Sequence, residues 1–190
     1  MKIPRIKPET WNASAGLMAN NIDTKRSQGV RHPHSYDHDL LLGVIRNEYD
    51  TFAAVYYGAE MYEEIGANWF SAMAIMCLDM IKFYADDTFE EDVTASSLLP
   101  MLTKKQLDYG YENINRFGTD GLLVRMHDKI ARLENLVANR KDLNVRDLDI
   151  YFESVEDTLK DLVGYCIIAC MVVRDIWNLP MNDKYDHIKI

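Results

Sequence analysis

Apolar residues recur every three or four positions through most of this sequence, which is the spacing of an amphipathic helix. No segment shows the alternation with a period of two that predicts a strand. Asp37 or Asp39 is a candidate N-cap for the first helical segment, and Gly58 is a residue that can end it. The helices that we expect are 38–58, a turn or two at 60–65, 69–84, a short helix ending near 109, 122–139 and 152–177. The pattern therefore predicts an all-α protein with a helical bundle.

The same pattern divides the chain into four regions. Residues 1–37 mix Pro, Asn, Ser, Gly and charge without a sustained period, so we expect an irregular arm there. Residues 38–97 are expected to form helices that pack on the bundle. The bundle itself is expected over 98–179, and a tail over 180–190.

Composition narrows the class of partner and the compartment. The chain has 190 residues, with 21 Lys plus Arg against 30 Asp plus Glu and a net charge of −9. An acidic protein lacks the cations that neutralise duplex phosphates, so a duplex nucleic acid is not expected as a partner. The three Cys form no closed disulfide set, and two of them lie in the most apolar stretch, which favours a reducing, cytoplasmic setting. That stretch, 162–173, is too short to span a bilayer, and the opening residues show no secretory pattern, so we expect no membrane partner.

Three carboxylates fall on one face of the last expected helix. Glu153, Asp157 and Asp161 are spaced by four, which places them within an arc of about 80°. Oxygen ligands of this kind bind Mg²⁺ or Mn²⁺. The alternative is a solvated N-terminal turn, where the helix dipole favours acids. Asp161 lies among apolar residues, and a buried carboxylate needs a cation or a metal beside it.

Basic residues lie on the preceding expected helix. Arg125, Lys129 and Arg132, together with Asp128, share a contiguous arc of about 100° beside the apolar stripe. One interpretation is a set of interhelical salt bridges that fix the register of the bundle. The other is a site in the bundle core, where acids hold a metal and cations hold phosphate oxygens. Both interpretations can hold, with some of these residues in salt bridges and others in the site.

Two further groups of residues are weaker candidates for metal binding. Glu60, Glu63 and Glu64, with Asp79 on the next helix, form a second acidic cluster, for which a solvated face is the simpler interpretation. Histidines and an aspartate near the start of the first helix suggest a metal or an HD-type hydrolase site, but a turn that leads into an N-cap fits better. These residues are His32, His34, His38 and Asp39, with His127 and His187 elsewhere in the chain.

An ordered series of short motifs runs from about Leu98 to Val173. It reads Lys105-Gln106, Asp108-Tyr109-Gly110, Asn113-Ile114, Phe117-Gly118, Gly121, Val124-Arg125, Asp128-Lys129, Ala131-Arg132-Leu133, Asn135-Leu136, Glu153-Ser154, Asp157-Thr158, Asp161-Leu162 and Gly164-Tyr165. This series resembles the phage nucleotide-modification-associated domain family, whose members are similar to MazG-type all-α nucleoside triphosphate pyrophosphohydrolases. Residues 1–97 have no counterpart in that resemblance.

The resemblance implies an enzyme fold, a reaction and a set of site residues. It implies a MazG-like bundle, present as a homodimer or homotetramer in the host cytoplasm, that uses Mg²⁺ or Mn²⁺ to split a (deoxy)nucleoside triphosphate into monophosphate and pyrophosphate. The implied catalytic and metal-binding residues are Asp128, Glu153, Asp157 and Asp161. The implied nucleotide-binding residues are Lys105, Tyr109, Asn113, Arg125, Lys129 and Arg132.

The chain departs from the acidic motifs of those enzymes. They carry Glu-Glu-x-x-Glu on one helix and Glu-x-x-Asp on the next, whereas 122–139 offers only Asp128 and Glu134, and the last helix reads Asp157-x-x-x-Asp161. The alternative function is therefore a non-catalytic phage protein that binds a host or phage protein through its acidic surface. If the carboxylate ladder holds a metal, Asp161→Asn should abolish turnover and preserve or raise stability without Mg²⁺, because a repulsive charge is removed.

Overall fold

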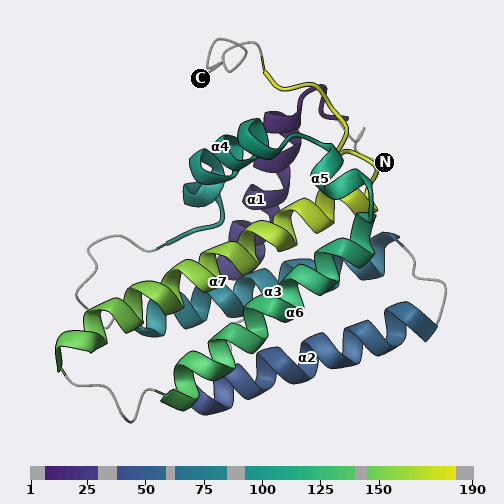
Figure 1. Ribbon diagram of the computed structural model, residues 1–190. Helices are drawn as coiled ribbons and strands as arrows, with labels where there is room; N and C mark the ends of the chain where they lie inside the picture. The colour runs from purple at the N-terminus through teal and green to yellow at the C-terminus, as the bar shows by residue number, and fades with distance from the viewer. Residues whose placement is uncertain (1–6, 30–37, 59–62, 85–92, 140–144, 183–190) are drawn as a thin grey trace.

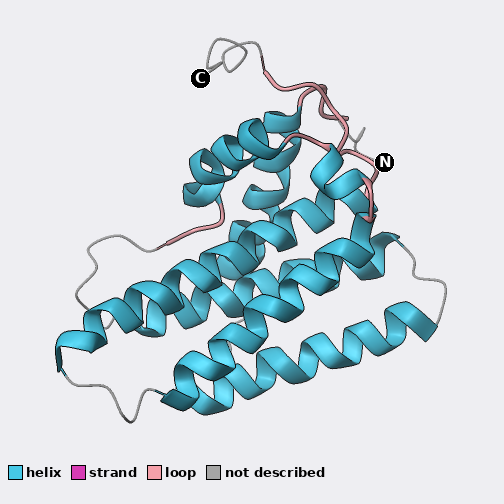
Figure 2. Ribbon diagram, in the orientation of Figure 1, coloured by secondary structure: helices cyan, strands magenta, loops and turns pink. Residues whose placement is uncertain are grey.

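The described part of the chain is entirely helical and contains no strand (Figures 1 and 2). The computed structural model describes residues 7–29, 38–58, 63–84, 93–139 and 145–182, and it describes side chains over 7–29, 42–57, 65–82, 93–139 and 154–182. The elements are α1 (Trp11–Ser27), α2 (His38–Gly58), α3 (Glu63–Tyr84), the 3-10 helix η1 (Ser96–Leu98), α4 (Leu99–Tyr109), α5 (Glu112–Asn115), α6 (Gly118–Asn139) and α7 (Val145–Val173). The all-α prediction is confirmed. None of the described helices is both long and apolar enough to cross a membrane.

Four long helices form the bundle. Helix α2 packs on α3 and α6, and α7 packs on the same two helices, so the four close a ring around a shared core (Figure 1). The contact between α3 and α7 is the most extensive. Both helices supply long apolar runs, and the segment 73–78 is buried at every position. The core therefore lies along the α3–α7 contact, and α2 and α6 cover its other side.

Helix α1 corrects the expectation of an irregular arm, which is wrong for residues 11–27. Thr10 caps this helix, since its hydroxyl oxygen accepts a hydrogen bond from the backbone N–H of Ala13 at 3.2 Å. Trp11, Met18 and Ile22 are buried, and the helix packs on α7 and α3. These apolar positions do keep helical spacing, but the Asn, Ser and Gly residues between them hide the stripe in the sequence.

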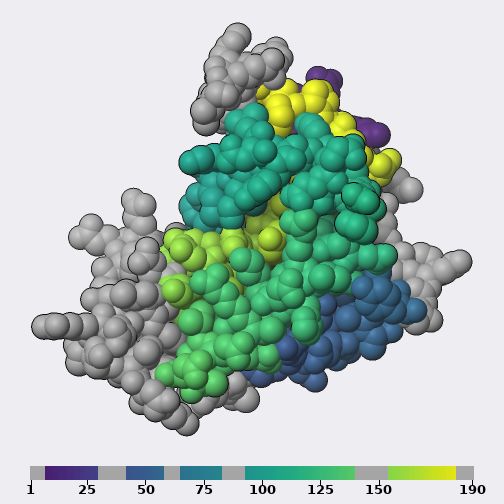
Figure 3. Space-filling model, viewed as in Figure 1, coloured from purple at the N-terminus to yellow at the C-terminus, as the bar shows by residue number. Residues whose placement is uncertain are grey.

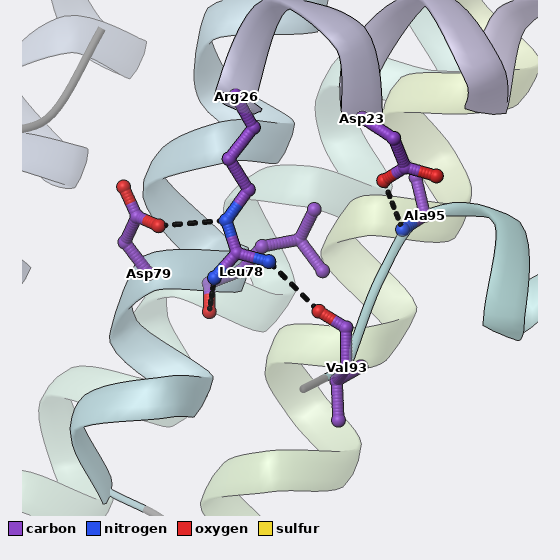
Figure 4. A network of polar contacts seen from close by, with 6 residues as sticks. All are labelled: Asp23, Arg26, Leu78, Asp79, Val93 and Ala95. Carbon is purple, nitrogen blue, oxygen red and sulfur yellow. Dashed lines mark hydrogen bonds and ion pairs between the residues drawn. The ribbon is translucent and has the colours of Figure 1, made fainter. Parts of the chain in front are cut away.

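Two charged residues of α1 fasten it to the rest of the fold (Figure 4). Arg26 Nε donates to Asp79 Oδ1 on α3 at 2.8 Å, and Arg26 Nη1 donates to the carbonyl oxygen of Val93 at 2.9 Å. Asp23 Oδ1 accepts from the backbone N–H of Ala95 at 2.8 Å. The segment that leads into η1 and α4 is thereby held against α1, which fixes where α4 begins.

The end of α7 and the segment that follows it return to α1. Helix α7 ends at Val173 rather than near residue 177, and the backbone turns at Asp175, whose φ is 53°. Ser14 Oγ donates to the carbonyl oxygen of Ile176 at 2.9 Å, and Trp11 N donates to that of Pro180 at 2.8 Å. The segment 174–182 is therefore packed against α1 and forms part of the fold.

Other helix boundaries differ from the prediction by a turn or two. Helix α3 is continuous from Glu63, so the expected separation of a turn at 60–65 from a helix at 69–84 is wrong. Helix α6 begins at Gly118 rather than at 122, and α7 begins at Val145 rather than at 152. The glycine-punctuated stretch before α6 contains the short helix α5. The predicted bounds of α2 and the predicted ends of α4 and α6 agree with the structure.

Candidate functional site

A cavity of about 310 Å³ lies beside α7, where α4, α5 and α6 meet α1 and the segment after α7. Its apolar wall comes from widely separated parts of the chain: Trp11, Leu102, Ile114, Ile168 and Trp177. The rings of Trp11 and Trp177 pack edge to face with centroids 5.9 Å apart. In the space-filling view, yellow-green atoms of α7 lie between the teal atoms of α4 and the green atoms of α6 (Figure 3).

Three cations also line the cavity. Lys105 comes from α4, and Arg125 and Lys129 come from α6, where a spacing of four puts them on one face. Arg125 Nη2 donates to Asn113 Oδ1 at 2.5 Å, and this bond orients the guanidinium. With Asp161 as the single carboxylate among the lining residues, this wall has a formal charge of +2 in a chain whose total is −9.

Asp161 on α7 pairs with two of these cations. Its Oδ2 accepts from Lys129 Nζ at 2.7 Å, and its Oδ1 accepts from Lys105 Nζ. Burial penalises the charged form and by itself would raise the pKa of Asp161. The hydrogen bonds from Lys105 and Lys129 outweigh that penalty, so the pKa lies below the ordinary value of 3.8. The carboxylate is therefore ionised at neutral pH, with both oxygens bonded.

The cavity wall is rich in hydrogen-bond donors. Besides the three cations, Trp11 Nε1, Gln106 Nε2 and Trp177 Nε1 are buried nitrogen atoms that have no partner among the described residues. Leaving a buried donor unpaired costs about 1–3 kcal/mol. These three nitrogen atoms have almost no accessible surface, so the donors open to a ligand in the cavity are those of the three cations, which favour acceptors such as phosphate, carboxylate or carbonyl oxygens.

Two glycines affect α4, the helix that carries Lys105: one ends it and the other lets it approach α7. Gly110 ends α4 with a φ of 65°, a left-handed conformation that glycine adopts without strain, and its N–H bonds to the carbonyl oxygen of Gln106. Gly164 lets α4 approach α7 closely, since a Cβ added there would lie 2.8 Å from Leu102 Cδ2. The backbone thus brings Lys105 within reach of Asp161.

Six of the residues predicted for the site lie together in this cavity. They are Lys105, Tyr109, Asn113, Arg125, Lys129 and Asp161. Arg132, Asp128 and Asp157 do not line it and are exposed to solvent. Asp128 lies on the α2 side of α6, where its charge contributes to raising the pKa of Tyr49, after the larger effect of burial. The side chain of Glu153 lies outside the described residues.

The predicted metal-binding groups do not assemble within the described part of the chain. No three His, Cys, Asp or Glu side chains there lie close enough together to hold a metal ion. Both oxygens of Asp161 are bonded to lysines, and Asp79 of the second acidic cluster is bonded to Arg26. The remaining side chains of that cluster and of the histidine group lie outside the described residues, except for His127, which packs near Tyr49. These are Glu60, Glu63, Glu64, His32, His34, His38, Asp39 and His187.

Sequence reasoning missed nine residues that line the cavity, and those with polar or aromatic side chains are Trp11, Gln106, Tyr165 and Trp177. Tyr165 follows Asp161 by four, so helical spacing alone placed it on the same face. Gln106 adjoins Lys105 and belongs to the same motif. Trp11 and Trp177 carried no comparable signal, because one was assigned to an irregular arm and the other to the end of a helix.

Comparisons with known proteins identify no relative of this chain. No family model, curated protein or solved structure matches it. The resemblance to the nucleotide-modification-associated family therefore stays a prediction, and what it implies about function is for this chain a proposal.

Proposed function

We propose that this chain binds a nucleotide in the cavity, with the phosphate group on Lys105, Arg125 and Lys129. The observation that carries the proposal is this group of three cations, which lines a cavity in a chain of net charge −9. Asp161 neutralises part of this charge, and the net charge of +2 that remains on the cavity wall favours a role in binding an anion.

The three cations suit a phosphate group in different ways. Arg125 presents a planar fork that Asn113 orients, and such a fork binds two phosphate oxygens at once. Lys105 and Lys129 carry point charges on flexible stems, and each ammonium has further N–H donors besides the one given to Asp161. Phosphate oxygens can therefore bond to all three side chains from within the cavity.

The remainder of the cavity suits a ring. Ile168 is a partly exposed apolar residue of the lining, and Tyr109 and Tyr165 are exposed or partly exposed aromatic residues that suit stacking. The volume of about 310 Å³ lies at the lower end of the range of ligand pockets, about 300–1,000 Å³. That size favours a compact nucleotide over a long or branched ligand.

Hydrolysis of a (deoxy)nucleoside triphosphate by Mg²⁺ is a further proposal that the resemblance alone supports. The described carboxylates do not fit a magnesium site, because Asp161 is bonded to two lysines and Asp157 and Asp128 lie outside the cavity. We therefore assign no catalytic step to them. Non-catalytic binding of another protein through the acidic surface likewise stays a prediction.

Arg125→Ala tests the binding proposal. Isothermal titration of the common ribo- and deoxyribonucleoside monophosphates and triphosphates should find at least one ligand of the wild-type protein. Arg125→Ala should then weaken that ligand about 10- to 100-fold, because a charge-assisted hydrogen bond contributes about 1.5–3 kcal/mol.

Arg132→Ala is the matched control. It removes the same charge from the same helix, seven residues further on, but Arg132 is exposed and does not line the cavity. The affinity of Arg132→Ala should stay within about twofold of wild type, since an exposed side chain outside the cavity makes no contact with a ligand there and its charge is screened by salt. An equal loss of affinity in Arg125→Ala and Arg132→Ala, or the absence of any ligand of the wild-type protein in the panel, would contradict the proposal.

A pyrophosphate-release assay on the same panel with Mg²⁺ tests hydrolysis separately. Release of pyrophosphate by the wild-type protein would support the enzyme. Binding without release would leave the binding proposal intact and contradict hydrolysis of the ligands tested.

A further inference from the structure

Asp161 lies between two of the three cations to which the proposed function assigns phosphate binding. Oδ1 accepts from Lys105 Nζ on α4, and Oδ2 accepts from Lys129 Nζ on α6 at 2.7 Å. The side chain of Asp161 is 22% exposed, and that of Lys129 is 23% exposed. The carboxylate is therefore partly buried and lines the cavity, and each of its oxygens is bonded to one lysine.

Those two lysines are the hydrogen-bond partners that the described residues provide for this carboxylate. Both lysines have long, rotatable stems, and Lys105 is the more exposed, at 44%. Nothing in the described contacts of Asp161 prevents a lysine from moving its ammonium from the carboxylate to another anion. The arrangement of an oxygen on each of two ammonium groups is also the one that a phosphate group would adopt there.

The charge of the cavity wall depends on Asp161. Three cations and one carboxylate give +2, and the wall without this carboxylate would carry +3. A phosphate monoester carries about −1.5 to −2 at pH 7. Such a group therefore balances the wall as it stands, whereas a longer phosphate chain brings excess negative charge close to the Asp161 carboxylate.

We infer that Asp161 is an internal counter-ion that competes with the ligand for Lys105 and Lys129, and so sets the site to accept the dianionic phosphate of a nucleoside monophosphate. This inference rests on the proposed function. A bound phosphate takes at least one of the two ammonium groups from Asp161. The carboxylate then stays nearby and repels any additional phosphate charge.

Asp161→Asn tests the inference, because asparagine keeps the size of the side chain and removes its charge. Titration of wild-type and variant protein with inorganic phosphate, pyrophosphate and nucleoside monophosphates, with a chelator and no metal, should show tighter binding to the variant. We expect a gain of roughly tenfold for a monophosphate and a larger gain for pyrophosphate, since the removed repulsion grows with ligand charge.

Asp157→Asn is the matched control. It removes the same charge from the same helix one turn earlier, at an exposed residue that does not line the cavity, and its affinities should equal those of wild type. Thermal melting of each variant establishes that it is folded at the temperature of the titration. If Asp161→Asn fails that criterion, Asp161→Ala provides the same comparison with a smaller side chain.

The outcomes separate this inference from the proposed function. Binding to wild type with equal or weaker binding to the Asp161 variants overturns the inference alone. Binding to the variant but not to wild type contradicts the proposed function and overturns the inference, because Asp161 would then exclude the ligand instead of setting the site to accept a monophosphate. The absence of binding to wild type and to every folded Asp161 variant overturns both.

Discussion

The stability that Asp161 contributes is expected to depend on pH in a defined direction. Burial penalises its charge, but the hydrogen bonds from Lys105 and Lys129 outweigh that penalty, and the pKa in the folded protein lies below the ordinary 3.8. A carboxylate whose pKa is lower in the folded than in the unfolded state stabilises the fold at pH values above the unfolded pKa. That contribution is lost as the pH falls from about 4 toward the folded pKa.

Asp161→Asn should therefore destabilise the protein at neutral pH and not at low pH. We expect a loss of about 1–2 kcal/mol at pH 7, between the values for exposed and fully buried pairs, because Lys105 and Lys129 are left facing each other without an anion. Urea unfolding of wild type and variant at pH 7 and near pH 3 measures the difference at each pH. A difference that stays constant over this range would contradict the ion-pair account.

This expectation reverses the one drawn from the sequence. A ladder of three like charges on one helix face predicted that removing Asp161 would preserve or raise stability. The ladder gave no information about the helix opposite, and Lys105 on α4 and Lys129 on α6 supply the cations that turn repulsion into attraction. Spacing along one helix predicts which side chains are neighbours on that helix, but the partners across the bundle decide the sign of the interaction.

The same limit explains which site residues the sequence grouped correctly. The spacing of Arg125 and Lys129 put them on one face of α6, and both line the cavity. Arg132 continues the same face but lies outside it. The cavity includes residues of α5, which packs on α6, and helical periodicity does not show where a neighbouring element stops.

Helix α1 is a structural part of the bundle, and its buried and exposed faces should respond very differently to substitution. Ile22 is 0% exposed and belongs to the main core, whereas Leu17, on the same helix, is 47% exposed. Ile22→Ala should lower the free energy of unfolding by about 2–5 kcal/mol, because it removes buried methyl groups and leaves a cavity. Leu17→Ala should change it by less than about 0.5 kcal/mol.

Urea unfolding followed by circular dichroism compares the two variants with wild type. Both substitutions shorten an aliphatic side chain to alanine within one helix, so helix propensity is closely matched and burial is the main difference. If residues 11–27 formed an arm that did not pack on the bundle, both substitutions would change the free energy of unfolding by small and equal amounts. That result would contradict the packing of α1 on α3 and α7.

At the level of elements, the sequence predicted best where polar and apolar faces are sharply divided. Helices α2 and α6 have clear apolar stripes and ended where expected. Helix α7 was expected to begin at 152 but begins at Val145. The prediction was wrong because the first turns contain Arg146, Asp147 and Asp149, which give them the composition of a solvated loop. Charged residues are compatible with the first turns of a helix, so composition alone did not distinguish the two.

The molecule as a whole combines a negative total charge with a positive cavity whose wall comes from both ends of the described chain. Trp11 and Trp177 meet in that wall, and the segment after α7 bonds to the start of α1. Unfolding that separates these ends destroys the cavity. Binding of an anionic ligand is therefore coupled to the stability of the whole fold rather than to one helix.

A ligand that occupies this cavity should raise the melting temperature of the entire protein. At a free concentration of 100 times its Kd, a ligand specific for the folded state adds about 2.7 kcal/mol. For a chain of 190 residues this corresponds to about 5–10 °C. Melting followed by circular dichroism should show one transition that moves as a unit with the tightest-binding nucleotide from the titrations.

Two controls make that shift specific to the cavity. Sodium chloride at the same ionic strength measures how much stability comes from screening the net charge of −9 alone, without occupancy of the site. Arg125→Ala, at the same ligand concentration, should show a smaller shift, because its affinity is lower while its net charge differs by only one unit. If salt and ligand raise the melting temperature equally, or if the ligand raises it equally in wild type and Arg125→Ala, the nucleotide acts by screening. It then does not bind between α4, α6 and α7.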